Sequence, residues 1–251
     1  MKDLFVIILA GGLGKRMNSE TPKVLHTVHG LPMLLHVIRA ANELKPKKIL
    51  LVVGKYKALI RTTLESYIDN DNGIDIDIGI DDIEFVDQHE PSGTGNAVLC
   101  CKDFLLRHTN NSKTIILSGD VPLIESATLT KMVERDHQVS ILTTSFINPT
   151  GYGRIVMKND VFQKIVEEKE CDEREKDIQL VNAGIYLFDT DILCRYVGNI
   201  KCNNSQAEYY ITDIFETIKE CNIDTMCIDT KSQYQIMGIN TQRQLEDVNA
   251  L

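Results

Sequence analysis

The feature that most constrains this fold is the alternation of strand-length apolar runs with helix-length amphipathic segments along the first 145 residues. Several of the apolar runs lack polar alternation, which is typical of strands covered on both faces. This order predicts an α/β protein with a doubly wound, mostly parallel, Rossmann-like sheet. Ligands of such sheets bind beyond the carboxyl ends of the strands.

The expected elements are spread over the whole chain, with no linker at which to divide it, so one domain over residues 1–251 is predicted. The polar run 167–177 makes the second half less regular and predicts a smaller mixed subregion, with antiparallel strands and loops over the site. Ser126 is expected to cap the fourth helix. Strands are expected at residues 4–10, 49–53, 83–86, 114–117, 139–145, 181–188 and 225–228, and helices at 33–44, 57–68, 95–106, 127–136, 210–221 and 241–251.

Composition excludes several function classes. Seven cysteines without a C-x-x-C pair argue against a disulfide framework and a zinc site. The apolar run at residues 4–10 is too short to span a membrane and has no signal-peptide cleavage site, so a cytoplasmic protein without a membrane partner is expected. A net charge of −9 argues against binding nucleic acid. A small polyanionic substrate remains compatible, because Lys15, Arg16 and Lys23 lie close together in the sequence.

The segment LAGGLGKRM at residues 9–17 follows the first expected strand and is a candidate phosphate cradle. Its glycines allow backbone N–H groups to approach phosphate oxygens. It is not a Walker A loop, because Leu9 and Arg16 replace the required Gly and Ser or Thr. A Rossmann G-x-G-x-x-G pattern fails at Met17. Neither an ATPase nor a dehydrogenase is favoured, and a plain turn at the end of a strand is the alternative.

Two cations after this loop suit phosphate chemistry. Arg16 can clamp a phosphate bidentately, and Lys23 supplies a point charge for a transferred phosphoryl group. As the alternative, Lys15 and Arg16 are ordinary solvated surface charges.

The stretch LAGGLGKRMNSETPKVLHTVHGLPMLLHVIRAA resembles the opening of the N-acetylglucosamine-1-phosphate uridylyltransferases, the N-terminal half of a bacterial bifunctional enzyme. The spacing from Arg16 to Lys23 and the PKVLH continuation are more specific than the glycines. The resemblance implies a nucleotide-diphospho-sugar transferase fold, the substrates UTP and N-acetylglucosamine 1-phosphate, and Mg²⁺ as cofactor. It implies catalytic roles for Arg16 and Lys23, and nucleotide binding by Leu9, Ala10, Gly11, Gly12, Gln88, Gly93 and Thr94.

Gln88 opens the segment QHEPSGTGNAV. Its amide can donate and accept at once, which suits the edge of uracil, and Gly93 and Thr94 allow close backbone approach. The family resembled here uses Gln and Gly-Thr at matching positions to hold the base. Taken alone, Gln88 is equally compatible with a surface amide and the glycines with a turn that starts a helix.

Asp120 in SGDVP follows the apolar run TIIL and is expected at the carboxyl end of a strand. Magnesium prefers one or two carboxylates with phosphate oxygens and water. The resemblance implies Asn240 as the second ligand and Gly119 as a substrate-binding residue. The alternatives are that Asp120 is a turn residue and that Asn240 caps the last helix, which is favoured for Asn240 alone.

Four later segments, PTGYGRI, IVEE, VNAGIY and AEYYITDI, resemble the family's sugar-binding segments. Gly153 would admit the sugar, while Glu167 and Asn182 would hydrogen-bond its hydroxyl or acetamido groups. Glu208, Tyr209 and Thr212 are further possible sugar contacts. The alternatives are a solvated acidic face for Glu167 and a core role for the aromatic residues.

The expected reaction is an in-line attack of the sugar phosphate on the α-phosphorus of UTP, with release of pyrophosphate. Lys15, Ser118 and the segment IMGIN depart from the family pattern and leave the exact base and sugar open. The chain stops where the bacterial enzyme continues into a β-helix acetyltransferase, so acetyl transfer is not predicted. A different sugar 1-phosphate, a different base or a noncatalytic nucleotide-sugar sensor are the alternatives, and the sequence does not give the oligomeric state.

Overall fold

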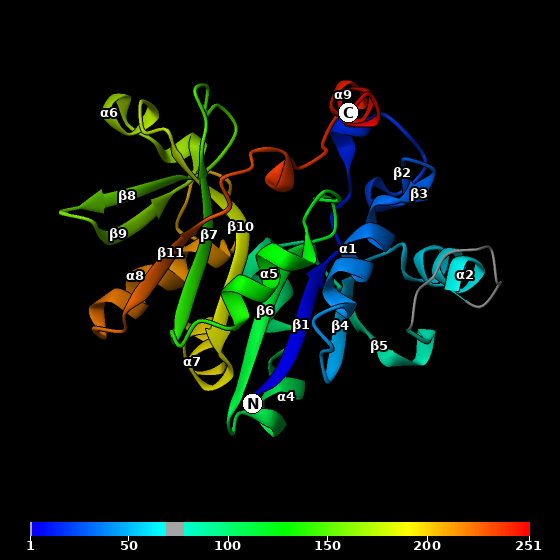
Figure 1. The fold of residues 1–251 in the computed structure, drawn as a ribbon, viewed down its shortest axis with the longest axis horizontal. Coiled ribbons are helices and arrows are strands. Elements are labelled where there is room, and N and C mark those ends of the chain that lie inside the picture. The colour runs from blue at the N-terminus through cyan, green and yellow to red at the C-terminus, as the bar shows by residue number, and fades with distance from the viewer. Residues whose placement is uncertain (1, 69–77) are drawn as a thin grey trace.

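A computed structural model describes residues 2–68 and 78–251 and confirms the α/β architecture (Figure 1). In this part of the chain one sheet has the strand order β11-β7-β10-β6-β1-β4-β5, and a β8–β9 hairpin attaches to β10. A second, two-stranded sheet joins β2 (Thr27–Val28) to β3 (Leu31–Pro32). The main sheet contains β1 (Asp3–Leu9), β4 (Lys48–Val53), β5 (Ile83–Asp87), β6 (Ser112–Ser118), β7 (Val139–Ser145), β8 (Arg154–Lys158), β9 (Val161–Val166), β10 (Leu180–Asp189) and β11 (Thr225–Asp229).

Strand direction divides the sheet into two parts. β1 pairs in parallel with β4 and β6, and β4 pairs in parallel with β5. β10 runs antiparallel to β6, β7 and β8, and β8 runs antiparallel to β9. The mostly parallel first half and the mixed second half are therefore as predicted. All seven predicted strands are present, but the β8–β9 hairpin was not predicted, because polar residues such as Lys158 and Asp160 interrupt its apolar pattern.

The helices agree with the predictions less closely. The helix predicted over residues 95–106 is divided at Cys100 and Cys101, and α6 and α7 were not predicted. Ser126 is not the cap of α5: Glu125 holds that position, and the Ser126 hydroxyl donates to Glu43. The α-helices are α1 (Met33–Asn42), α2 (Lys57–Ile68), α3 (Thr94–Leu99), α4 (Lys102–Leu105), α5 (Ser126–Val133), α6 (Glu173–Lys176), α7 (Thr190–Tyr196), α8 (Ile214–Glu220) and α9 (Gln242–Asn249). Short 3-10 helices lie at Lys15–Met17, Lys23–Leu25, Ile80–Asp82, Leu106–His108, Glu168–Glu170, Val197–Asn199, Ile211–Asp213 and Tyr234–Ile236.

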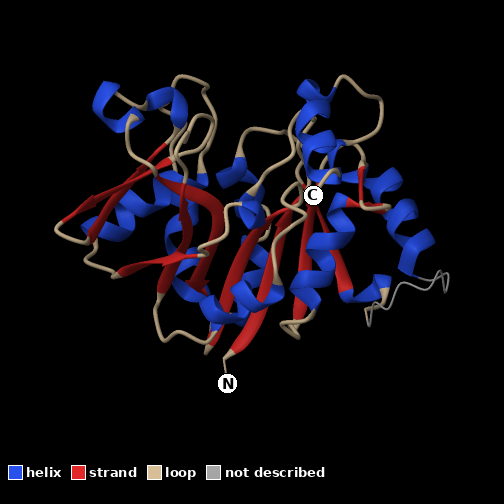
Figure 2. Ribbon diagram, turned by 45° about the horizontal axis from the view of Figure 1, so that its top comes forward, coloured by secondary structure: helices blue, strands red, loops and turns tan. Residues whose placement is uncertain are grey.

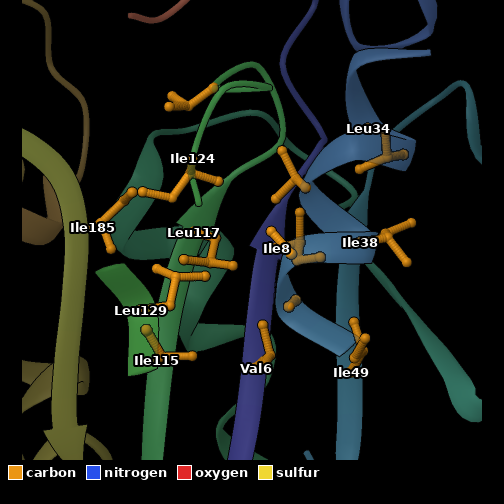
Figure 3. Packing of buried hydrophobic residues seen from close by; sticks show 14 of the residues in the cluster. Val6, Ile8, Leu34, Ile38, Ile49, Ile115, Leu117, Ile124, Leu129 and Ile185 are labelled. Atoms are coloured by element: carbon orange, nitrogen blue, oxygen red, sulfur yellow. The ribbon is translucent and has the colours of Figure 1, made fainter. Parts of the chain in front are cut away.

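Helices cover both faces of the sheet (Figure 2). Val6 and Ile8 of β1 belong to a buried cluster that includes residues of α1 and α5 (Figure 3). The alternate residues Phe5 and Ile7 belong to a second cluster with Phe215 of α8. A strand buried on both faces needs apolar side chains at every position, which explains the unbroken apolar run of β1. None of the helices in the described residues is both long enough and apolar enough to cross a membrane.

The last helix, α9, docks beside the segment that follows β1, at the edge of the sheet opposite the N-terminus (Figure 1). Gln242 donates to the Met17 carbonyl at 3.2 Å, and Asn249 accepts from the His29 N–H at 2.8 Å. Val28, Met33, Ile239 and Val248 form a small apolar cluster beneath it. The C-terminal segment is thereby fixed to the N-terminal region that carries the glycine-rich loop.

Candidate active site

The glycine-rich loop turns sharply beyond β1, as the sequence predicts. Gly14 has a φ of +60°, and a Cβ built on it would lie 2.7 Å from Cβ of Lys23. A Cβ on Gly11 would lie 2.8 Å from Oε1 of Gln88, whereas one on Gly12 would meet nothing within 4 Å. Two of the three glycines are therefore required by close contacts, and the third leaves space open over the loop.

A pocket of about 490 Å³ lies over this loop, and we call it the glycine-loop pocket. Every residue that the sequence predicts to bind nucleotide lines it, together with Lys23 and Asp120. The fold therefore brings these predicted residues together around one pocket. The lining residues are Leu9, Ala10, Gly11, Gly12, Leu13, Gly14, Lys23, Val24, Gln88, Pro91, Gly93, Thr94, Ala97, Ser118, Asp120 and Glu208.

Gln88 lies directly after β5 and is 6% exposed, so the surface-amide alternative is wrong. Its Nε2 donates to the Gly93 carbonyl at 3.1 Å and to Oδ1 of Asn96 at 3.0 Å. Because both amide hydrogens are directed to protein acceptors, the carbonyl Oε1 beside Gly11 is the atom that can meet a ligand. The Gln88 side chain is thus available to a ligand only as an acceptor, whereas the sequence suggested that it both donates and accepts. Asn96, which fixes it, was not predicted.

Gly93 and Thr94 connect the glycine-loop pocket to the C-terminal half. Gly93 has a φ of +114°, and a Cβ there would lie 2.5 Å from the Tyr209 carbonyl oxygen. Thr94 Oγ1 accepts from the Ile211 N–H at 3.0 Å, and α3 begins at Thr94. The helix-start turn is therefore present, and Gly93 is required here by the Tyr209 backbone, while its approach to a base stays a prediction. Tyr209, predicted as a sugar contact, meets this turn through its backbone.

Four side chains form what we call the Lys23 cluster at the mouth of the glycine-loop pocket: Lys23, Asp120, Asn240 and Arg16. Lys23 Nζ donates to Asp120 Oδ2 and, at 3.0 Å, to Asn240 Oδ1. Arg16 Nη2 donates to the same Asn240 oxygen at 2.9 Å. Asp120 follows β6, so it lies at the carboxyl end of a strand as predicted. The sequence thus placed all four of these residues in one site.

Asn240 does not cap the last helix, so the alternative favoured for this residue alone is wrong. Thr241 is the cap of α9, and its side chain accepts from the Gln244 N–H at 3.2 Å. Asp120 holds the same segment, because its carbonyl accepts from the Ile239 N–H at 2.9 Å. This backbone contact brings the Asn240 and Asp120 side chains to one point.

The donor set of this cluster fits a hard divalent cation. A carboxylate oxygen of Asp120 and the amide oxygen of Asn240 converge on one positive atom, the Lys23 ammonium nitrogen. Magnesium is usually held by one or two such oxygens together with substrate phosphates. Within residues 2–68 and 78–251, no group of three or more His, Cys, Asp or Glu side chains is arranged to hold a metal ion.

A second polar group, the Glu167–Asn182 cluster, consists of Gly153, Glu167, Asn182 and Thr212. Thr212 Oγ1 donates to Glu167 Oε1 at 2.8 Å, and the Asn182 N–H donates to the Gly153 carbonyl at 2.9 Å. Burial raises the pKa of Glu167, and the Thr212 hydrogen bond only partly offsets this. Glu167 is therefore not part of a solvated face, and four of the residues predicted to bind sugar lie together, whereas Gly119 and Tyr209 lie beside the glycine-loop pocket.

Two of the predicted sugar residues have structural contacts as well. Asn182 accepts from the Gly184 N–H at 3.0 Å and donates to the Tyr186 hydroxyl at 2.7 Å, so its amide is held at both ends. The Gly119 N–H donates to the Leu9 carbonyl oxygen at 3.0 Å. A Cβ built on Gly119 would lie 3.0 Å from the same oxygen. Gly119 therefore lets the ends of β1 and β6 approach each other.

Tyr152 and Arg154 both stand in PTGYGRI, but no role was predicted for either residue. Tyr152 stacks on Phe146 with ring centroids 4.8 Å apart. Burial, and secondly the charge of Asp120, raise the pKa of Tyr152. An aromatic residue between two glycines and an Arg at the start of a strand were the available signals. Tyr152 brings the segment before β8 close to the Lys23 cluster.

With this geometry described, comparison with known proteins identifies the family. The profile of the family described as "Nucleotidyl transferase" matches residues 5–234. This chain belongs to the nucleotidyl transferase family. It is 40% identical to a "Probable UDP-N-acetylglucosamine pyrophosphorylase" of Acanthamoeba polyphaga mimivirus, with 99% of this chain and 96% of that protein covered.

Bacterial relatives of the nucleotidyl transferase chain are longer. This chain is 35% identical to the "Bifunctional protein GlmU" of Cupriavidus taiwanensis, and the match covers 98% of this chain but 51% of that protein. The chain thus spans about half the length of these bifunctional relatives. A solved structure titled as a putative glucose-1-phosphate thymidylyltransferase from Bacillus anthracis superposes with a TM-score of 0.73 at 21% identity, over 98% of this chain and 94% of that one. This structural likeness supports the fold.

Proposed function

We propose that this nucleotidyl transferase joins UTP to N-acetylglucosamine 1-phosphate, forming UDP-N-acetylglucosamine and pyrophosphate. The observation that carries the proposal is the convergence of Lys23, Asp120 and Asn240 at the mouth of the glycine-loop pocket. The names of the relatives from mimivirus and Cupriavidus taiwanensis point to the same substrates. We further propose that residues 1–251 act as one nucleotidyltransferase domain in the cytoplasm.

Chemistry in this site is direct displacement. A phosphate oxygen of the sugar phosphate attacks the α-phosphorus of UTP, the bond to the bridging oxygen breaks, and pyrophosphate leaves with the electron pair. Lys23 and Arg16, which meet at Asn240 Oδ1, lie where their charges can stabilise the departing pyrophosphate. Asp120 and Asn240 would hold Mg²⁺, which when bound offsets the negative charge of the two substrates' phosphates.

The two polar groups divide recognition between them. Gln88 would accept the N3–H of uracil through Oε1, since its Nε2 hydrogens are already directed to Gly93 and Asn96. The Glu167–Asn182 cluster would hydrogen-bond the hydroxyl and acetamido groups of the sugar. A buried polar group left unpaired by an analogue costs affinity, so such a site discriminates strongly.

The test is pyrophosphate release from purified protein with Mg²⁺, UTP and N-acetylglucosamine 1-phosphate. Glucose 1-phosphate and the other nucleoside triphosphates are assayed in parallel. Release with the first pair is the expected result. Release only with another pair would keep the chemistry and reject the proposed base or sugar. Nucleotide binding without release from any pair would reject the enzyme in favour of a nucleotide-sugar sensor.

A further inference from the structure

Arg154 is the largest side chain that the described fold buries completely, with 1% of its surface exposed. Its Nη1 pairs with Glu168 Oε2 at 2.7 Å and also donates to the Tyr152 carbonyl. Nη2 donates to the Lys176 carbonyl at 3.4 Å, and Nε has no hydrogen-bond partner among the described residues. A charged group is thus enclosed with one of its donors unsatisfied.

Stability alone does not explain this arrangement. The guanidinium loses its hydration, while the Glu168 side chain is 31% exposed, so water screens the attraction that would offset this cost. The unpaired Nε adds a further cost. What the guanidinium provides that an apolar side chain does not is a fixed set of directed contacts to three separate segments.

Those contacts surround the Glu167–Asn182 cluster. Glu168 Oε2 also accepts from the Gly151 N–H at 3.1 Å, so the ion pair connects the turn before β8 to the residue next to Glu167. Gly153 lies between Tyr152 and Arg154, and its carbonyl accepts from Asn182 on β10. Removing the guanidinium would leave Glu168 and the Tyr152 carbonyl, the chain neighbours of Glu167 and Gly153, without their shared partner.

We propose that Arg154 is a positioning residue that shapes the sugar subsite through Glu168 and the Tyr152 carbonyl. The inference deepens the proposed function and rests on it. None of the contacts described for Arg154 reaches the residues that line the glycine-loop pocket. Loss of the side chain should therefore weaken use of the sugar phosphate and leave use of the nucleotide unchanged.

The test is steady-state kinetics of Arg154→Lys and Arg154→Met with each substrate varied in turn. We expect the KM for N-acetylglucosamine 1-phosphate to rise about tenfold or more, because small displacements of positioning groups have large effects. The KM for UTP should stay within about twofold of the wild type, since the nucleotide contacts are separate. Arg195→Met is the matched control, because the Arg195 side chain is 62% exposed in its 3.4 Å pair with Asp191.

A second variant separates positioning from folding. Arg154→Met with Glu168→Met removes both charges, so it leaves no carboxylate without its partner. We expect it to melt near the wild-type temperature and to keep the raised KM for the sugar phosphate. Recovery of that KM in the double variant, or equal rises for both substrates, would overturn the inference. Wild-type protein that turns over no sugar phosphate would instead overturn the proposed function, and the inference with it.

Discussion

The glycine-loop pocket and the Glu167–Asn182 cluster differ in what gives them shape. The pocket is formed by backbone, with Gly11, Gly14 and Gly93 at places where a Cβ would collide. The cluster is formed by side chains such as Glu167 and Asn182, which are held by buried hydrogen bonds. The first kind of site fails when a side chain is added, and the second fails when a polar partner is lost. The two should therefore respond differently to substitution.

The largest effect should come from substitution of Lys23. It would assign the phosphoryl-transfer step to the glycine-loop pocket and not to the Glu167–Asn182 cluster. Lys23→Ala should lower kcat by about 10²–10³-fold, because a directed charge on the departing pyrophosphate is lost. Pyrophosphate release measures this, and circular dichroism checks the fold. Lys47→Ala, which removes an exposed 2.7 Å pair with Asp3, is the control. Near-wild-type turnover of the Lys23 variant would refute the role.

Gly93 tests the backbone contact between the two regions. Gly93→Ala would place a Cβ 2.5 Å from the Tyr209 carbonyl at a φ of +114°, so the free energy of unfolding should fall by about 3 kcal/mol. Gly30 has a φ of +84°, and a Cβ built there would meet nothing within 4 Å. Gly30→Ala should therefore lower the free energy of unfolding by only about 1 kcal/mol. Urea denaturation compares them, and equal losses would show that backbone strain, not the collision, decides.

Asp213 tests the acidic surroundings of Glu167. Burial first, and then the charges of Glu216 and Glu167, raise the pKa of Asp213 from 3.8 to about 6. The folded state then binds a proton more readily than the unfolded state, so the free energy of unfolding falls as pH rises from about 4 to about 6. Because the side chain is partly exposed and screened, Asp213→Asn should stabilise the protein at pH 8 by only about 1 kcal/mol.

Melting temperatures across this pH range measure the effect. The difference between Asp213→Asn and wild type should vanish only well below the unfolded-state pKa of 3.8, where Asp213 is protonated in both states. A constant difference at all pH values would show that the carboxylate's charge is not the cause.

The smallest effect is expected in the loop that precedes Tyr209. Ala207 has a φ of +52°, a region that favours glycine. Ala207→Gly relieves the strain but makes the unfolded chain more flexible, so a net gain of about 0.5 kcal/mol is expected. Thermal denaturation checks this value. A loss of stability would show that contacts of the alanine methyl group outweigh the strain.

The elements of the fold differ in how well the sequence predicts them. The bounds predicted for β7 and α2 agree with the structure residue for residue. Both elements have a local pattern of apolar residues that can be recognised from the sequence alone. The β8–β9 hairpin was missed, because its strands carry polar residues and pair only with each other and β10. The available signal was the two-residue connection Asn159–Asp160, whose φ angles of +49° and +60° are typical of the tight turns that join hairpin strands.

The residues of the candidate site also differ in how well the sequence predicts them. The glycines and the spacing from Arg16 to Lys23 were visible because they stand in one short segment. Asn240, judged alone, was read as a helix cap, since nothing nearby in sequence reports its hydrogen bond to Lys23. Arg154 was overlooked, because burial of a charged side chain depends on segments that the fold brings together.

The position of Asn240 has a consequence for synthesis of the protein. It stands 217 positions after Lys23, on the segment that α9 anchors beside the glycine-rich loop. During translation, the glycine-rich loop and Asp120 leave the ribosome long before this residue does. A chain terminated just upstream of it would retain the glycine-loop pocket but lack the oxygen on which Arg16 and Lys23 converge. Under the proposed function, such a fragment would keep the proposed nucleotide site but lack an oxygen proposed to hold the metal ion, so catalytic competence would require the chain through at least Asn240.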